Sequence, residues 1–270
     1  MATKNSCYTS LGNPGRIWAV PAIHGEIERL TKLHDNILEK ITPSDRIVYL
    51  GNYTGYGNHS AECIDEILTF RRLILSIPGM MPKDLAYLRG AQEEMWQKLL
   101  QLQFAPDPTD VLLWMLGNGL SNTLYSYGLS PHDGIEACSS GTMSLTKWTA
   151  KIRNTIRRSP GHEVFNTQLI QAAHTDKEAA YPMLFVHAGL NTEKPLNKQG
   201  DHLWWAGQSF EEINTTYDPF QKVIRGYDPN HNGVHLNCVT ATIDGGCGFG
   251  GPLIGAGFSS DGQVFEMLEA

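Results

Sequence analysis

Polar residues able to do chemistry stand directly after short apolar runs of the sequence. His24 follows the run RIWAVPAI, Asn52 follows IVYLG, and His187 follows MLFV. Polar side chains and glycines just after strands are where α/β proteins usually build their chemistry. The segment IVYLGNYTGYGNHS, residues 47–60, keeps the glycines of such a loop but carries uncharged residues such as Asn52 and Tyr56. It therefore predicts an active-site framework that has lost its charged groups.

Eight short apolar runs predict β-strands, since they are short and separated by longer stretches of helical spacing. They are RIWAVPAI (16–23), DRIVYLGNY (45–53), DLAYLRG (84–90), MLFVHAGL (183–190), FQKVIRGY (220–227), NCVTATID (237–244), PLIGAGFS (252–259) and QVFEML (263–268). Two stretches between the early runs predict amphipathic helices that cover a sheet.

The two predicted helices lie at residues 26–41 and 60–77. The first has apolar residues on one stripe, namely Ile27, Leu30, Leu33, Ile37 and Leu38. The second opens with Ser60, a residue type that often caps helices.

The order of these elements predicts one large α/β domain. Residues 1–15 form an N-terminal extension, and residues 16–270 form the domain, with a helical middle segment at about 91–176. Inside that middle segment we expect a surface loop at Ser130–Gly141, followed by a helix at about 145–156.

Composition narrows the classes of partner. The net charge of −7 gives no basic field for nucleic acid, and no apolar stretch is long enough to cross a membrane. The five cysteines form no C-x-x-C pair, which indicates reduced thiols. We therefore expect a cytoplasmic protein that binds neither nucleic acid nor membrane.

Four strand-end segments resemble the motifs of the metallophosphoesterase (calcineurin-like) superfamily, in particular the PPP-type serine/threonine phosphatases and their bacterial relatives. VPAIHG is similar to the GDxHG motif, LGNYTGYG to GDxxDRG, RGAQE to GNHE, and FVHAG to the second histidine strand. Three further segments, at about 117–128, 195–210 and 218–258, match in the same order. The resemblance implies an α/β sandwich of two mixed β-sheets flanked by helices.

The family holds two metal ions with carboxylate, amide and imidazole ligands. The positions that correspond to these ligands carry Ala22, His24, Asn52, Ala91, His187 and Tyr227. Only the two histidines keep the residue type that the resemblance implies. The Asn52 amide is neutral and cannot bridge two cations, so we expect no metal cofactor.

The substrate-handling positions differ as well. Gly55 and Tyr56 replace the second aspartate and the arginine of GDxxDRG, Gln92 replaces the acid–base histidine, and Ala206 replaces a further arginine. No catalytic residue is expected. We expect the motif glycines to remain because their turns need positive φ or close backbone approach, and Tyr53, Tyr56 and Tyr227 to fill the emptied space.

These substitutions predict a catalytically inactive pseudophosphatase that binds another protein or forms a subunit of a complex, with self-association possible. Two alternatives stay open. The first is a divergent phosphoesterase with one metal ion on His24, Asn52 and His187, helped by Asp228 or His231. The second is a binding module for a small anion or nucleotide that uses Arg89 and Arg225.

Overall fold

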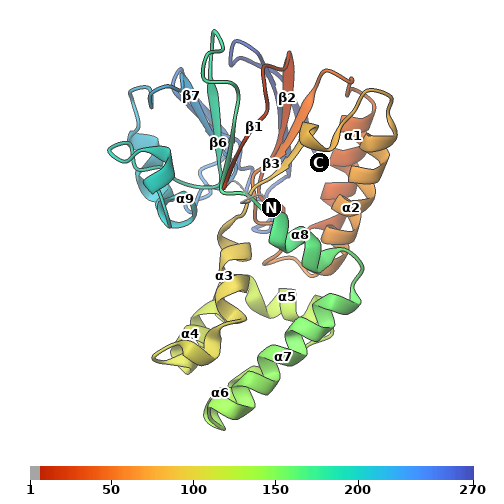
Figure 1. The fold of residues 1–270 in the computed structure, drawn as a ribbon, viewed down its shortest axis with the longest axis vertical. Coiled ribbons are helices and arrows are strands. Elements are labelled where there is room, and N and C mark those ends of the chain that lie inside the picture. The colour runs from red at the N-terminus through yellow and green to blue at the C-terminus, as the bar shows by residue number, and fades with distance from the viewer. Residues whose placement is uncertain (1–6) are drawn as a thin grey trace, which may run out of the picture.

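Two mixed β-sheets pack face to face at the centre of the computed structural model, which describes residues 7–270 (Figure 1). The six-stranded sheet has the order β1-β5-β6-β7-β9-β8, and the five-stranded sheet has the order β11-β10-β2-β3-β4. The strands are β1 (Tyr8–Ser10), β2 (Arg16–Val20), β3 (Arg46–Tyr49), β4 (Leu85–Tyr87), β5 (Ala172–His174), β6 (Met183–Val186), β7 (Lys222–Arg225), β8 (His235–Leu236), β9 (Thr240–Thr242), β10 (Ile254–Ser259) and β11 (Val264–Glu269).

The predicted sandwich of two mixed sheets is confirmed, and each of the eight predicted segments contains a strand. Sequence reasoning missed β1, β5 and β8, which are only two or three residues long. β1 lies inside the predicted N-terminal extension and pairs in parallel with β5, from Tyr8 opposite Ala172 to Ser10 opposite His174. Residues 1–6 of that extension lie outside the described residues.

β2 shows how one strand serves both faces of its sheet. Ile17 and Ala19 point into the core between the two sheets, whereas Trp18 and Val20 belong to the core under the covering helices. Successive side chains of a strand point to opposite faces, so an apolar run without alternation marks a strand buried on both sides. The alternation of side chains along β2 therefore places residues of one strand in both apolar cores.

Helix α1 (Ile27–Leu38) covers the outer face of the five-stranded sheet together with α2 (Ser60–Ser76) (Figure 1). Leu30, Leu33 and Ile37 of α1 are fully buried, as predicted. Leu38 is 38% exposed, so its place on the predicted stripe is wrong. The stripe instead continues through His34, which is buried and packs its ring on Phe70 at 3.8 Å.

Ser60 does not cap α2, contrary to the prediction. It is itself the first residue of the helix, and His59 precedes it without a capping side-chain bond. The Ser60 hydroxyl oxygen accepts a hydrogen bond from the Gly55 backbone N–H at 3.1 Å. Ser60 thus supports the loop after β3.

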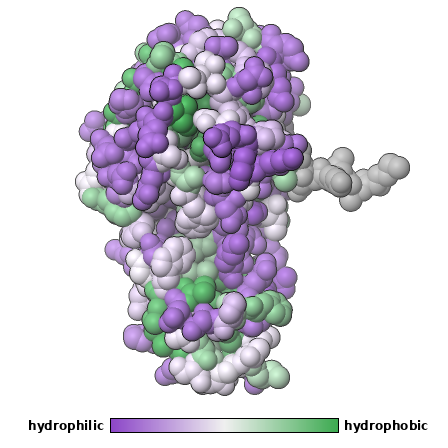
Figure 2. Space-filling view, turned by 90° about the vertical axis from the view of Figure 1, so that its left-hand side faces the viewer, coloured by the Kyte–Doolittle hydropathy of each residue, from purple (hydrophilic) through white to green (hydrophobic). Residues whose placement is uncertain are grey.

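Helices of the middle segment form a second lobe below the sheets (Figure 1). They are α3 (Ala91–Leu99), α4 (Pro108–Met115), α5 (Ser121–Ser126), α6 (Pro131–Ser139), α7 (Thr142–Arg158) and α8 (His162–Gln168), and the short α9 (His202–Trp205) lies beside the six-stranded sheet. The lobe has an apolar core of its own, to which Trp96 and Trp148 contribute. Apolar surface gathers on this lobe in Figure 2, while the body above it is mostly hydrophilic.

The loop predicted at Ser130–Gly141 is wrong, because α6 fills most of it. Pro131 stands at the first helical position, a common helix start that composition alone obscured. Gly134 lets α6 approach α7 closely, since a Cβ there would lie 2.5 Å from the Trp148 ring. The helix predicted at about 145–156 lies within α7 and is confirmed.

No helix within residues 7–270 combines the length and the apolar character needed to cross a membrane.

Neighbouring residues of α1 give a paired test of this packing. We expect Ile37→Ala to lower the free energy of unfolding by about 2–4 kcal/mol, because it leaves a cavity under the helix. Leu38→Ala should cost less than about 1 kcal/mol, because that side chain is partly in water. Urea unfolding of both variants measures the difference, and equal losses would contradict the assigned face of α1.

Candidate functional site

The loops after β2, β3, β6 and β7 meet at one edge of the sandwich and bring four of the predicted positions together. The Asn52 Nδ2 atom lies 3.4 Å from His24 Nε2. The His187 ring stacks on the Tyr227 ring at 5.4 Å between centroids, and the His24 ring lies 5.5 Å from that of Tyr227. Parallel strands place their carboxyl ends side by side, which is why motifs far apart in the chain converge here.

The motif glycines have the geometry that the sequence predicted. Gly51 has φ +90° and Gly25 has φ +81°. A Cβ on Gly51 would lie 2.5 Å from the Gly90 nitrogen, and one on Gly189 would lie 2.4 Å from the carbonyl carbon of Ala206. Any larger residue would push these loops apart.

Gly55 and Ala206 stand where the resemblance implies charged residues, and both lie against backbone or ring atoms. A Cβ on Gly55 would come within 2.7 Å of His24 Nδ1, so glycine leaves room for the imidazole. Ala206 ends α9 and packs its carbonyl group on Gly189. Ala22 and Ala91 are buried and bring only methyl groups to the site.

Sequence reasoning missed Glu93, a buried carboxylate that holds the β3 loop. Its Oε2 atom accepts hydrogen bonds from the backbone N–H groups of Asn52 at 2.8 Å and Gly90 at 2.9 Å. Its Oε1 atom accepts from the Tyr53 N–H at 2.9 Å. Burial raises the pKa of Glu93, and these backbone donors oppose that rise. A glutamate three residues after Gly90, at the start of a helix, is a capping signal that could have found it.

Asn52 has both ends of its side chain engaged. Its Oδ1 atom accepts a hydrogen bond from the Gln92 backbone N–H at 2.9 Å, and its Nδ2 faces His24. The Gln92 side chain, at the position of the implied acid–base histidine, instead donates to the Asn118 carbonyl at 2.8 Å in the helical lobe. Asn52 has φ +55° and His24 has φ +54°, conformations that asparagine and histidine adopt more readily than most residues.

The two retained histidines are fully buried and neutral. Burial lowers the pKa of His24 to about 3 and that of His187 to about 4. His187 Nδ1 donates to the Leu50 carbonyl at 2.6 Å. Its Nε2 atom has no hydrogen-bond partner among residues 7–270. His187 therefore keeps one free imidazole nitrogen inside the site.

Aromatic rings surround His24. Tyr56 and Phe249 each lie 5.3 Å from it, and they contact each other at 4.4 Å between centroids. Tyr56 and Tyr227 thus fill the space as predicted, and sequence reasoning missed Phe249, which packs on His24 from a glycine-rich loop although it is itself 42% exposed. The prediction that Tyr53 helps to fill this space is wrong. Tyr53 lies under α2, and its hydroxyl group donates a hydrogen bond to the Leu88 carbonyl at 2.7 Å.

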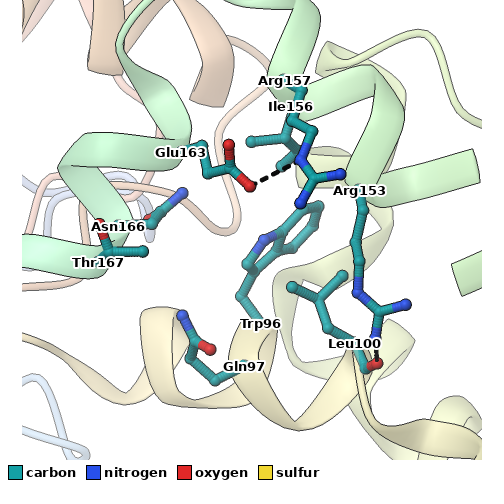
Figure 3. A pocket seen from close by; sticks show the side chains of 9 residues that line it. All are labelled: Trp96, Gln97, Leu100, Arg153, Ile156, Arg157, Glu163, Asn166 and Thr167. Carbon is teal, nitrogen blue, oxygen red and sulfur yellow. Dashed lines mark hydrogen bonds and ion pairs between the residues drawn. The ribbon is translucent and has the colours of Figure 1, made fainter. Parts of the chain in front are cut away.

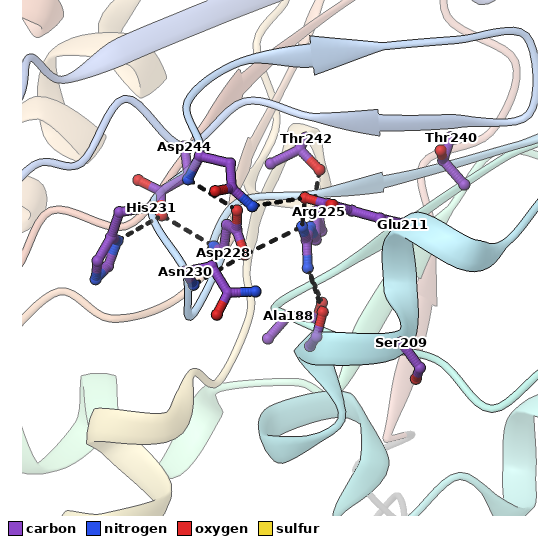
Figure 4. Close-up of polar contacts among 12 residues, drawn as sticks. Ala188, Ser209, Glu211, Arg225, Asp228, Asn230, His231, Thr240, Thr242 and Asp244 are labelled. Carbon is purple, nitrogen blue, oxygen red and sulfur yellow. Dashed lines mark hydrogen bonds and ion pairs between the residues drawn. The ribbon is translucent and has the colours of Figure 1, made fainter.

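Arg225 is fully buried and bound within the protein (Figure 4). It donates to the Gly207 carbonyl at 2.6 Å and to the Thr242 hydroxyl at 2.8 Å, and it pairs with Asp228 at 3.3 Å. The interpretation of Arg225 as an anion ligand is therefore wrong. Arg89 is partly exposed, but it pairs with Glu94 at 3.3 Å.

His231 and Asp244 form an ion pair at the edge of the same cluster. His231 Nδ1 lies 3.5 Å from Asp244 Oδ2, and the His231 ring packs on Phe249 at 3.8 Å. Burial alone would raise the pKa of Asp244, but His231 and the backbone N–H groups of Asp228 and Gly246 hold it below its usual range.

The side chains present do not fit the dinuclear centre that the fold implies. Two divalent ions about 3.5–4 Å apart repel each other by roughly 15–20 kcal/mol at an effective dielectric of about 20, so they need bridging and terminal anions. The ligand positions supply two imidazoles, one amide and one phenol, with no carboxylate. Among the described residues, no group of three or more His, Cys, Asp or Glu is arranged to hold a metal.

Three solved structures that are described as phosphatases share this fold. The chain is similar to a candidate diadenosine tetraphosphatase (17% identity, 97% of each chain covered, TM-score 0.55). It is also similar to a serine/threonine phosphatase from Saccharomyces cerevisiae (14% identity, 99% of this chain and 85% of that chain, TM-score 0.57). A cold-active protein tyrosine phosphatase matches at 13% identity over 97% and 80% of the two chains, with a TM-score of 0.53.

These likenesses show that the chain has the calcineurin-like metallophosphoesterase fold. No family model matches the sequence, and no curated protein matches it either.

The buried histidines predict a loss of stability in mild acid. The unfolded chain protonates a histidine below about pH 6.5, while His187 stays neutral in the folded state until about pH 4, so unfolding takes up protons in this window. We expect the wild type to lose about 2 kcal/mol for each of His24 and His187 between about pH 7 and about pH 4.5.

Urea unfolding across this pH range measures the effect in the wild type and in His187→Gln. The variant should show a smaller loss, while His59→Gln, at an exposed histidine, should behave like the wild type. An unchanged pH dependence in His187→Gln would contradict a neutral, buried imidazole.

Proposed function

We propose that the chain is a catalytically inactive pseudophosphatase that acts as a binding scaffold for another protein or as a subunit of a complex. The observation that carries this proposal is the Asn52 amide at the bridging position. Its oxygen accepts a hydrogen bond from the Gln92 N–H and its nitrogen faces His24, so this side chain offers no negative charge with which to bridge two metal ions.

The other groups that make large contributions to catalysis in this fold are also missing from the site. Phosphoester hydrolysis in this fold needs a general acid and cationic clamps for the developing charge. Gln92 is bound to the Asn118 carbonyl, Tyr56 is neutral, and Ala206 has only a methyl group. Binding to another macromolecule is the function that this scaffold can still perform without them, because fold and chemistry are separable.

A divergent phosphoesterase with one metal ion is the second candidate. The free Nε2 atom of His187 and the nearby His231–Asp244 pair favour it, because both present groups that can ligate a cation. The small-anion or nucleotide module has less support, because Arg225 is bound inside the protein.

Metal content separates the first two candidates. We expect sub-stoichiometric manganese, iron and zinc by inductively coupled plasma mass spectrometry of tag-free protein expressed with all three metals. No phosphomonoester or phosphodiester turnover should exceed that of the His187→Ala variant. One tightly held ion per chain, with turnover that His187→Ala abolishes, would overturn the proposal in favour of the phosphoesterase.

A variant that restores the missing carboxylates provides the matched comparison. Ala22→Asp with Asn52→Asp adds two anions beside His24, and a metal that binds only the folded state raises its Tm. Manganese should therefore raise the Tm of this variant and leave the wild-type Tm unchanged.

A further inference from the structure

A cavity of about 220 Å³ lies between α3, α7 and α8, away from the strand-end site (Figure 3). Trp96, Leu100 and Ile156 give it an apolar floor, and polar or charged residues form the rest of the wall: Gln97, Arg153, Arg157, Glu163, Asn166 and Thr167. An apolar floor with a few converging polar groups is the usual build of a binding pocket.

A second cavity of about 380 Å³ adjoins the first at Thr167, which lines both. It is lined by Cys7, Arg89, Thr167, Gln168, Leu169, Ile170 and Gln171. Thr167, near the C-terminal end of α8, therefore borders both cavities. We call the two cavities together the Thr167 groove.

Positive charge exceeds negative charge along the Thr167 groove. Arg153 donates to the Leu100 backbone carbonyl and pairs with no carboxylate among the described residues. Arg157 pairs with Glu163 at 2.8 Å, but these side chains are 58% and 50% exposed, so exchange of Glu163 for another carboxylate costs little. Such a site stands out on a chain whose net charge is −7.

Side-chain amides line the groove with free hydrogen-bonding capacity. Within residues 7–270, the amide groups of Gln97, Asn166, Gln168 and Gln171 make no hydrogen bond to the protein. Each amide offers a donor and an acceptor, which suits the alternating N–H and C=O groups of an extended peptide.

We propose that the Thr167 groove binds an extended, acidic segment of a partner protein. One bulky apolar side chain of that segment enters the cavity above Trp96, and flanking Asp or Glu residues pair with Arg153 and Arg157. This inference deepens the proposed scaffold function and rests on it.

The probe is a pool of fluorescein-labelled nine-residue peptides with one central Leu or Phe, Asp or Glu at alternating positions, and random residues elsewhere. Fluorescence anisotropy with the full chain should show saturable binding that weakens with added salt. A pool with Asn or Gln in place of the acids should bind at least roughly tenfold more weakly.

Charge variants locate the contact. Arg153→Gln with Arg157→Gln should weaken binding of the acidic pool by roughly tenfold, and Arg157→Glu, at an exposed position that folding does not need, should weaken it further. Arg72→Gln with Arg158→Gln removes the same charge from positions outside the groove and should bind like the wild type.

Three results would contradict the proposal that the Thr167 groove binds an acidic segment. They are absence of binding, equal binding of both pools, and undiminished binding by Arg157→Glu. Displacement of the acidic pool by an equal concentration of inorganic phosphate would assign a small-anion site instead. None of these results touches the metal and turnover tests, so the groove can fail while the scaffold proposal stands. Metal-dependent turnover would remove the scaffold proposal whatever the peptides do.

Discussion

The Glu93 carboxylate is the constraint on which the site and the helical lobe both depend. It accepts the backbone N–H groups of Asn52, Tyr53 and Gly90, and so ties the loop after β3 to the first turn of α3. Each buried N–H group left without a partner would cost about 1–3 kcal/mol, which makes these bonds expensive to lose. The interaction is made entirely by this chain's own groups, so it joins the β3 loop to the helical lobe whether or not the site is catalytic.

This dependence explains how the loop after β3 can keep its shape with the uncharged residues Asn52, Gly55 and Tyr56. A buried aspartate at position 52 would need a cation to offset its desolvation, whereas the Asn52 amide oxygen accepts the hydrogen bond from the Gln92 N–H without carrying a charge. Asparagine also tolerates the left-handed conformation, φ +55°, that this turn requires. The rings of Tyr56, Tyr227 and Phe249 then pack around His24 and shield its ring from water, although Phe249 is itself 42% exposed.

Sequence periodicity predicted the strands, whose apolar runs reflect burial. It missed the α6 helix and the side from which each ring enters the site. Most of the eight strands could be predicted because their runs are buried on both faces, although β11 is largely exposed, and the site positions converged because parallel strands end together. The α6 helix was missed because Gly134 and several serines lower helix propensity, while its contact with Trp148 overrides that preference. The exchange of Tyr53 for Phe249 in the aromatic cluster has a similar cause, since a loop sequence does not tell on which side a ring emerges.

The strand-end site and the Thr167 groove differ in how far their polar groups are already bonded. In the strand-end site, the side chains of Asn52, Gln92 and Arg225 are hydrogen-bonded to backbone groups, so a ligand could use them only by breaking those bonds, whereas His187 Nε2 is free. Around Trp96 the amides of Gln97 and Asn166 are free within the described chain. Binding is most favourable where each polar group that loses water forms a hydrogen bond to the ligand. Amides without a partner in the protein, beside an apolar floor, can form such bonds. These contacts favour the Thr167 groove over the strand-end site as the place where the proposed partner binds.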